Sequence, residues 1–107
     1  MKRGRIEDLA SGEASHILGD LVGGKRLGVG GYHRFKPGEV AHAGEKHIHD
    51  TDEVFLILQG RARLPIEGRP TAELVAGDIA VVEPGEDHHL TGDETDPAVL
   101  VWFHVED

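Results

Sequence analysis

The chain has 107 residues, with 11 Lys and Arg against 20 Asp and Glu, a formal net charge of −9 and no cysteine. This length fits one domain with its own core, and the absence of cysteine excludes disulfides and thiolate metal sites, so any bound metal must use His nitrogen and carboxylate oxygen. The acidic balance argues against nucleic-acid and membrane partners, and the lack of a signal-like or membrane-length apolar run makes the cytoplasm the default location.

Residues 1–24 carry no regular hydrophobic pattern. Their apolar side chains are scattered, and serines at positions 11 and 15 are possible helix caps. We expect a short N-terminal arm or helix here, followed by one domain over residues 25–107.

From residue 25 onward, the chain alternates short runs rich in β-branched and large apolar residues with Gly and Pro turn dipeptides. This pattern predicts an all-β fold, either a sandwich or a barrel. The glycines of "GVGGY" at 28–32 are expected to kink a strand, because no helical pattern and no Walker lysine follow them. The expected strands cover residues 25–35, 53–59, 61–66, 72–75, 78–83 and 98–105.

The last run, "AVLVWFHV", has two faces with a period of two, and both are largely apolar. Trp102 and His104 share one of these faces. A strand apolar on both sides is typical of a position between two sheets or at a subunit contact.

A histidine pattern begins just before the expected strand at 53–59. His47 and His49 lie two apart, Glu53 follows four later, and Gly60 follows seven after that. The chain has eight histidines, so a His-x-His pair alone is expected by chance roughly 0.6 times. Adding the Glu and Gly at fixed offsets lowers that expectation to roughly 0.01, which makes the pattern a signal.

Residues two apart point to the same side of a strand. His47 and His49 would therefore face one space, and Glu53 can rejoin that face with Phe55 and Ile57. Two imidazoles and a carboxylate in a water-poor cavity are a donor set for a divalent transition metal. A further ligand is expected from the segment at 77–90, where His88 follows a turn and His89 is its rival.

Candidate pocket residues come from several strands. On the first expected strand, either Tyr32 and Arg34 or His33 and Phe35 face the cavity, and the sequence leaves both open. Tyr32 and Arg34 would suit an anionic or sugar substrate. The candidate pocket comprises Tyr32, Arg34, His42, Phe55, Ile57 and Trp102.

These motifs resemble the two motifs of the cupin superfamily, over about residues 25–105. The first motif is matched by His47, His49, Glu53 and Gly60, and the second by Gly77, Gly85 and His88. The resemblance implies a double-stranded β-helix, or jelly-roll, barrel. It also implies a divalent metal (Fe, Mn, Ni, Zn or Cu) bound by His47, His49, Glu53 and His88. A homodimer is expected too, with the N-terminal arm packed on the partner.

The function expected from this resemblance is a metal-dependent enzyme acting on a small organic substrate, of dioxygenase, isomerase or lyase type. The alternative is a non-enzymatic module that binds a sugar, another metabolite or a metal. No residue is assigned a catalytic role, because a fold does not fix its chemistry.

Overall fold

The short apolar runs become β-strands in the computed structural model, which describes residues 1–9, 22, 26–44 and 48–106. The elements are β1 (Lys2–Arg5), α1 (Ile6–Leu9), β2 (Arg26–Arg34), β3 (Asp52–Gln59), β4 (Arg61–Leu64), β5 (Ala72–Val75), β6 (Asp78–Val82), β7 (Thr91–Gly92) and β8 (Val99–Glu106). The all-β class is confirmed, and each predicted strand lies within about two residues of an observed one.

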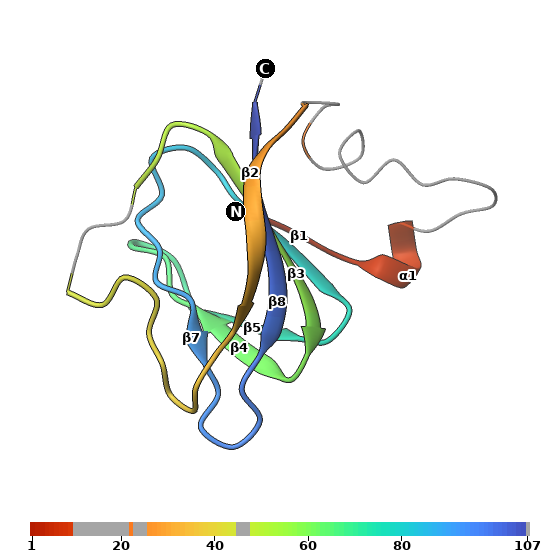
Figure 1. Ribbon diagram of the computed structural model, residues 1–107. Helices are drawn as coiled ribbons and strands as arrows, with labels where there is room; N and C mark the ends of the chain where they lie inside the picture. Colours follow the sequence, from red (N-terminus) through yellow and green to blue (C-terminus); the bar gives the residue numbers. More distant parts are fainter. Residues whose placement is uncertain (10–21, 23–25, 45–47, 107) are drawn as a thin grey trace.

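The described strands form two antiparallel sheets (Figure 1). The larger sheet has five strands in the order β1-β6-β3-β8-β2, and the smaller has three in the order β5-β4-β7. In the larger sheet, β3 lies between β6 and β8, two strands that are distant in the sequence. The opening of β3 is therefore flanked by residues from the middle and the end of the chain.

The main core lies between the sheets, and the alternation of side chains along β3 explains it. Phe55 and Ile57 point into this core, while Val54 and Leu56 belong to a second cluster on the opposite face of the larger sheet. Successive strand residues point to opposite faces, so a continuous apolar run such as β3 is buried on both.

Gly60 closes the tight connection from β3 to β4. Its φ is +73°, and an added Cβ would collide with the carbonyl oxygens of Asp96 and Pro97. Glycine is the residue that meets both demands. The fixed Gly of the sequence pattern thus sets the β3–β4 turn and, through it, the position of β3.

The predicted N-terminal arm is described only in part. Lys2–Arg5 form β1, which pairs antiparallel with β6 of the same chain, and α1 follows with 4 residues. Residues 10–21 and 23–25 lie outside the described residues. Within the described part of the chain, no helix has the length and apolar character needed to cross a membrane.

The burial of Ile57 and the exposure of its neighbour Leu58 predict that substitution by Ala lowers the free energy of unfolding by different amounts at the two positions. Ile57 is 0% exposed, whereas Leu58 is 47% exposed. We expect Ile57→Ala to lower the free energy of unfolding by about 2–5 kcal/mol, and Leu58→Ala to lower it by less than about 1 kcal/mol. Urea denaturation of both variants measures this, and equal losses would contradict the assigned faces.

Candidate metal centre

Glu53 is the second residue of β3 and lies at the centre of the site. It is 5% exposed and shares the inward face of the strand with Phe55. In the sheet register, Glu53 is opposite Val82 of β6 and His104 of β8. A buried carboxylate is costly unless hydrogen bonds or positive charge surround it, so its neighbours decide what it does.

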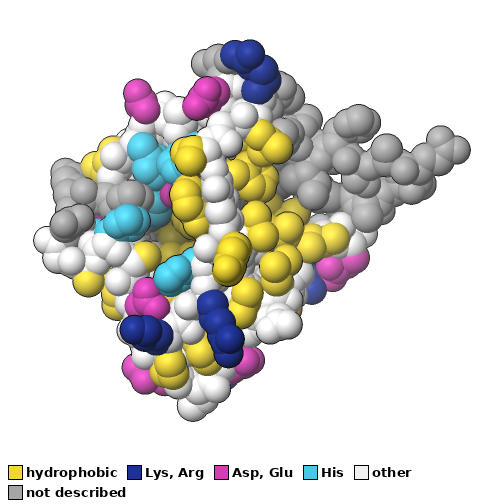
Figure 2. All heavy atoms as spheres, in the orientation of Figure 1, with side chains coloured by type: hydrophobic (Ala, Val, Ile, Leu, Met, Phe, Trp, Pro, Cys, Tyr) yellow, Lys and Arg dark blue, Asp and Glu magenta, His cyan; other side chains and the backbone are white. Residues whose placement is uncertain are grey.

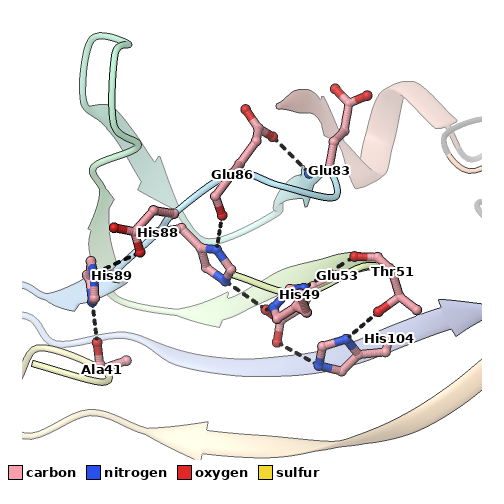
Figure 3. Close-up of polar contacts among 10 residues, drawn as sticks. Ala41, His49, Thr51, Glu53, Glu83, Glu86, His88, His89 and His104 are labelled. Atoms are coloured by element: carbon pink, nitrogen blue, oxygen red, sulfur yellow. Dashed lines mark hydrogen bonds and ion pairs between the residues drawn. The ribbon is translucent and has the colours of Figure 1, made fainter. Parts of the chain in front are cut away.

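Three imidazoles converge on this carboxylate (Figure 3). Nε2 of His49 and Nε2 of His88 each lie 3.0 Å from Oε1 of Glu53. Nε2 of His104 lies 3.5 Å from Oε2 of Glu53. The side chains come from the segment before β3, the segment after β6, and β8, so the fold rather than one local motif assembles the cluster.

The other nitrogen of each ring is held away from the centre. Nδ1 of His49 contacts the carbonyl oxygen of Thr51 at 3.2 Å, and Nδ1 of His88 contacts that of Glu86 at 2.8 Å. Nδ1 of His104 lies 3.0 Å from Oγ1 of Thr51. A carbonyl oxygen only accepts, so for His49 and His88 the Nδ1 carries the proton and Nε2 is the nitrogen available to a metal.

Charges in the cluster are strongly coupled. Burial by itself raises the pKa of Glu53, but the hydrogen bond from His88 and the charges of the surrounding histidines outweigh it, so this pKa lies below its ordinary value. Burial by itself lowers the pKa of His88, but the hydrogen bonds to Glu53 and to the Glu86 carbonyl leave it above its ordinary value. The pair therefore favours the charged forms when no metal is bound.

The cluster opens into a cavity of about 410 Å³. Figure 2 shows histidine side chains on this face beside hydrophobic ones. This volume suits a small organic ligand, and the mixture of apolar walls with a few polar groups is typical of ligand sites. The lining residues are His33, Phe35, Glu39, Ala41, His42, Glu53, Phe55, His88, Leu90, Leu100, Trp102 and His104.

Of the predicted metal ligands, the structure brings His49, Glu53 and His88 together. His47 lies outside the described residues. Ligand atoms of His49, Glu53 and His104 all lie within 4.8 Å of one another, so His104 belongs to the cluster as well. Sequence reasoning placed His104 beside Trp102 but gave it no ligand role.

The two adjacent histidines at 88 and 89 face different surroundings. His88 is 2% exposed and contacts Glu53. His89 pairs instead with Asp87 at 3.2 Å and with the carbonyl oxygen of Ala41 at 3.2 Å. His88 is therefore the member of this pair that reaches the cluster.

The predicted pocket residues divide into two groups. Phe55, Trp102 and His42 line the cavity, whereas Ile57 is in the core and outside the lining.

The structure does not place Tyr32 and Arg34 in the cavity, because β2 turns their face outward. Tyr32 is 78% exposed, and His33 and Phe35 take the inward positions instead.

Comparison with known proteins gives a family match. A family model described as a cupin domain matches residues 31–104. No curated protein matches the chain.

Three solved structures share the fold. A cupin protein from Bacteroides fragilis has a TM-score of 0.63 at 22% identity, over 72% of this chain and 64% of that one. The DMSP lyase DddQ from Ruegeria pomeroyi DSS-3 has a TM-score of 0.59 at 25% identity, over 71% of this chain and 36% of that one. An RmlC-like cupin family protein from Methanocaldococcus jannaschii, with a double-stranded β-helix fold, has a TM-score of 0.63 at 16% identity, over 71% of this chain and 67% of that one.

These likenesses confirm the predicted double-stranded β-helix fold. The chain spans less than two thirds of the B. fragilis protein and 36% of DddQ.

The raised pKa of His88 predicts how the stability of the metal-free protein changes with pH. Because the folded protein holds the His88 proton more tightly than the unfolded chain, protonation adds to the free energy of unfolding. This contribution is full below the unfolded pKa of about 6.5 and is lost as pH rises through the folded pKa. As pH rises above about 6.5, we expect the free energy of unfolding of wild type to fall relative to that of His88→Gln, by at most about 1.4 kcal/mol per pH unit. Urea denaturation across this range measures the difference.

His89→Gln is the matched control and should keep the wild-type slope, because His89 lies outside the cluster. A His88→Gln variant with the same pH dependence as wild type would contradict the assignment.

Proposed function

The chain belongs to the cupin family, and from this premise we propose that it binds a divalent transition-metal ion and acts on a small organic substrate. The proposed ligands common to the sequence motifs and the structure are His49, Glu53 and His88. The adjoining cavity of about 410 Å³ would hold the substrate.

The convergence of Nε2 atoms on Glu53 carries this proposal. With Nδ1–H donated to backbone carbonyls, neutral His49 and His88 direct Nε2 lone pairs toward a carboxylate. Lone pairs and an anion in one buried place repel each other unless protons or a cation lie between them. Nitrogen donors with one carboxylate fit Fe, Mn, Ni, Zn or Cu, and the donor set does not select among these metals.

The remaining coordination positions have two protein candidates. His104 lies within the cluster, with Nε2 at 3.5 Å from Glu53. His47 is proposed from its spacing to His49 in the sequence. Metal affinities of His47→Ala and His104→Ala separate them, because loss of a direct ligand costs far more affinity than loss of a neighbour.

Bound here, the metal would supply Lewis-acid polarisation of a substrate oxygen. The chain itself supplies the walls of the cavity, where Phe55 and Trp102 would pack on the substrate and exclude water. Among the expected reaction types, the likeness to DddQ supports a lyase. A binding module without turnover is the alternative, and the largely apolar lining of the cavity suits it too.

Metal content is the first test. We expect protein purified without a metal-affinity step and then loaded with metal to bind about one equivalent. His49→Ala should lower the affinity by a hundredfold or more, because it removes one of the few nitrogen donors. The matched control His89→Ala should bind as wild type does. A wild-type protein that binds none of the five metals would refute the proposal.

Acid should release the metal. The imidazoles must be neutral to coordinate, and their ordinary pKa is about 6.5. We therefore expect the metal dissociation constant to rise steeply as pH falls from about 7 to about 5. Isothermal titration calorimetry at several pH values measures this, and an affinity that does not change over the range would be inconsistent with histidine ligation.

A further inference from the structure

A second histidine–carboxylate pair lies on the wall of the same cavity, outside the metal cluster. Nε2 of His33 lies 2.9 Å from Oε2 of Glu39, and both residues line the cavity. His33 is on β2, and Glu39 is in the segment that follows it. The sequence left His33 open as one of two alternatives for facing the cavity and gave Glu39 no role.

Both members of the pair are held in place. The ring of His33 packs edge-to-face on Phe35, with 4.5 Å between ring centroids. Oε1 of Glu39 accepts a hydrogen bond of 2.9 Å from the backbone N–H of Lys36. This backbone hydrogen bond is the main cause of the lowered pKa of Glu39, to which His33 adds, while burial opposes it.

The ionised carboxylate fixes the role of each nitrogen of His33. Glu39 can only accept, so neutral His33 donates Nε2–H to it and has its lone pair on Nδ1. Among the described residues, Nδ1 of His33 has no hydrogen-bond partner. This nitrogen is therefore an acceptor available to a donor group of a bound ligand.

The register of the larger sheet sets the backbone spacing between His33 and the metal cluster. His33 is opposite Leu100 on β8, and His104 lies four residues further along that strand on the same face. Four residues of antiparallel strand separate their Cα atoms by about 13 Å, and side chains on one face project in parallel, so the polar ends of the site are about as far apart. A metal–oxygen bond of about 2 Å and a hydrogen bond of about 3 Å leave about 8 Å for the ligand between its polar ends.

We propose that the cavity takes short hydroxylated carboxylic acids, with the carboxylate at the metal and the hydroxyl donating to Nδ1 of His33. This inference rests on the proposed metal site, since a divalent cation there attracts the anionic end. Glu39 is the positioning residue that keeps Nδ1 of His33 an acceptor. The apolar side chains between the two ends, among them Phe55 and Trp102, fit the hydrocarbon part of such a ligand.

The preference for a hydroxyl group provides the test. Calorimetry on the metal-loaded protein compares ω-hydroxypentanoate with pentanoate, a pair that differs only in the terminal hydroxyl and has about the required length. We expect wild type to bind the hydroxylated acid about tenfold more tightly, as one added hydrogen bond allows. His33→Phe, which keeps an aromatic ring against Phe35, should reduce this ratio to about one without weakening pentanoate binding.

Tyr32→Phe is the matched control, because it removes a hydroxyl from the adjacent, outward-facing residue of β2. It should keep the tenfold ratio, whereas Glu39→Gln should reduce it, because the amide can also donate and so permits the other tautomer of His33.

A ratio that survives His33→Phe, or a wild type that binds metal but shows no preference or binds neither acid, would overturn the inference and leave the metal proposal standing. A chain that binds no metal would contradict both.

Nitrogen-15 NMR of the ligand-free protein gives a second readout that needs no variant. At a pH where His33 is neutral, we expect its proton on Nε2. A proton on Nδ1 would overturn the inference, since that nitrogen could then not accept a hydrogen bond from the ligand.

Discussion

The burial of one carboxylate, Glu53, is the constraint on which the site depends. The residue is 5% exposed, and an ionised carboxylate removed from water costs several kcal/mol unless donors or cations surround it. The fold meets this cost by bringing three Nε2 atoms to one side chain. His104 arrives because β8 pairs with β3 in the register that sets it opposite Glu53, and His88 arrives by the turn after β6. Protons on these Nε2 atoms compensate the negative charge of Glu53, and a metal ion bound among the same atoms would compensate it as well.

The cavity extends this polar centre into a mainly apolar space with a second polar pair at His33 and Glu39. A ligand in this space would meet a cationic centre at one end, hydrocarbon along its length and a hydrogen-bond acceptor at the other. Sites of this kind achieve selectivity through a few fixed polar groups rather than through apolar contact, because an unpaired polar group in a closed cavity is costly.

The sequence predicted the strands and the polar centre better than the cavity walls. The fixed spacing within the two motifs pointed to His49, Glu53 and His88, although His49 and His88 lie in the segments next to β3 and β6 and not on the strands. His104 has no such partner at a fixed offset; its signal is a lone polar residue on the inward face of an apolar strand, which burial alone cannot distinguish from a core histidine. The inward side of β2 was also left open, because a strand rich in glycine and polar residues has no apolar face to set its register.

We expect Nε2 of His49 and His88 and the carboxylate of Glu53 to coordinate a divalent metal. A crystal structure of the metal-loaded protein, with data collected at the absorption edge of the added metal, tests it most directly. Coordination by these groups predicts one anomalous peak at about 2.0–2.2 Å from the three side chains, with the Nδ1 hydrogen bonds of His49 and His88 unchanged. A peak elsewhere, or no peak while both histidines still hydrogen-bond to Glu53, would contradict it.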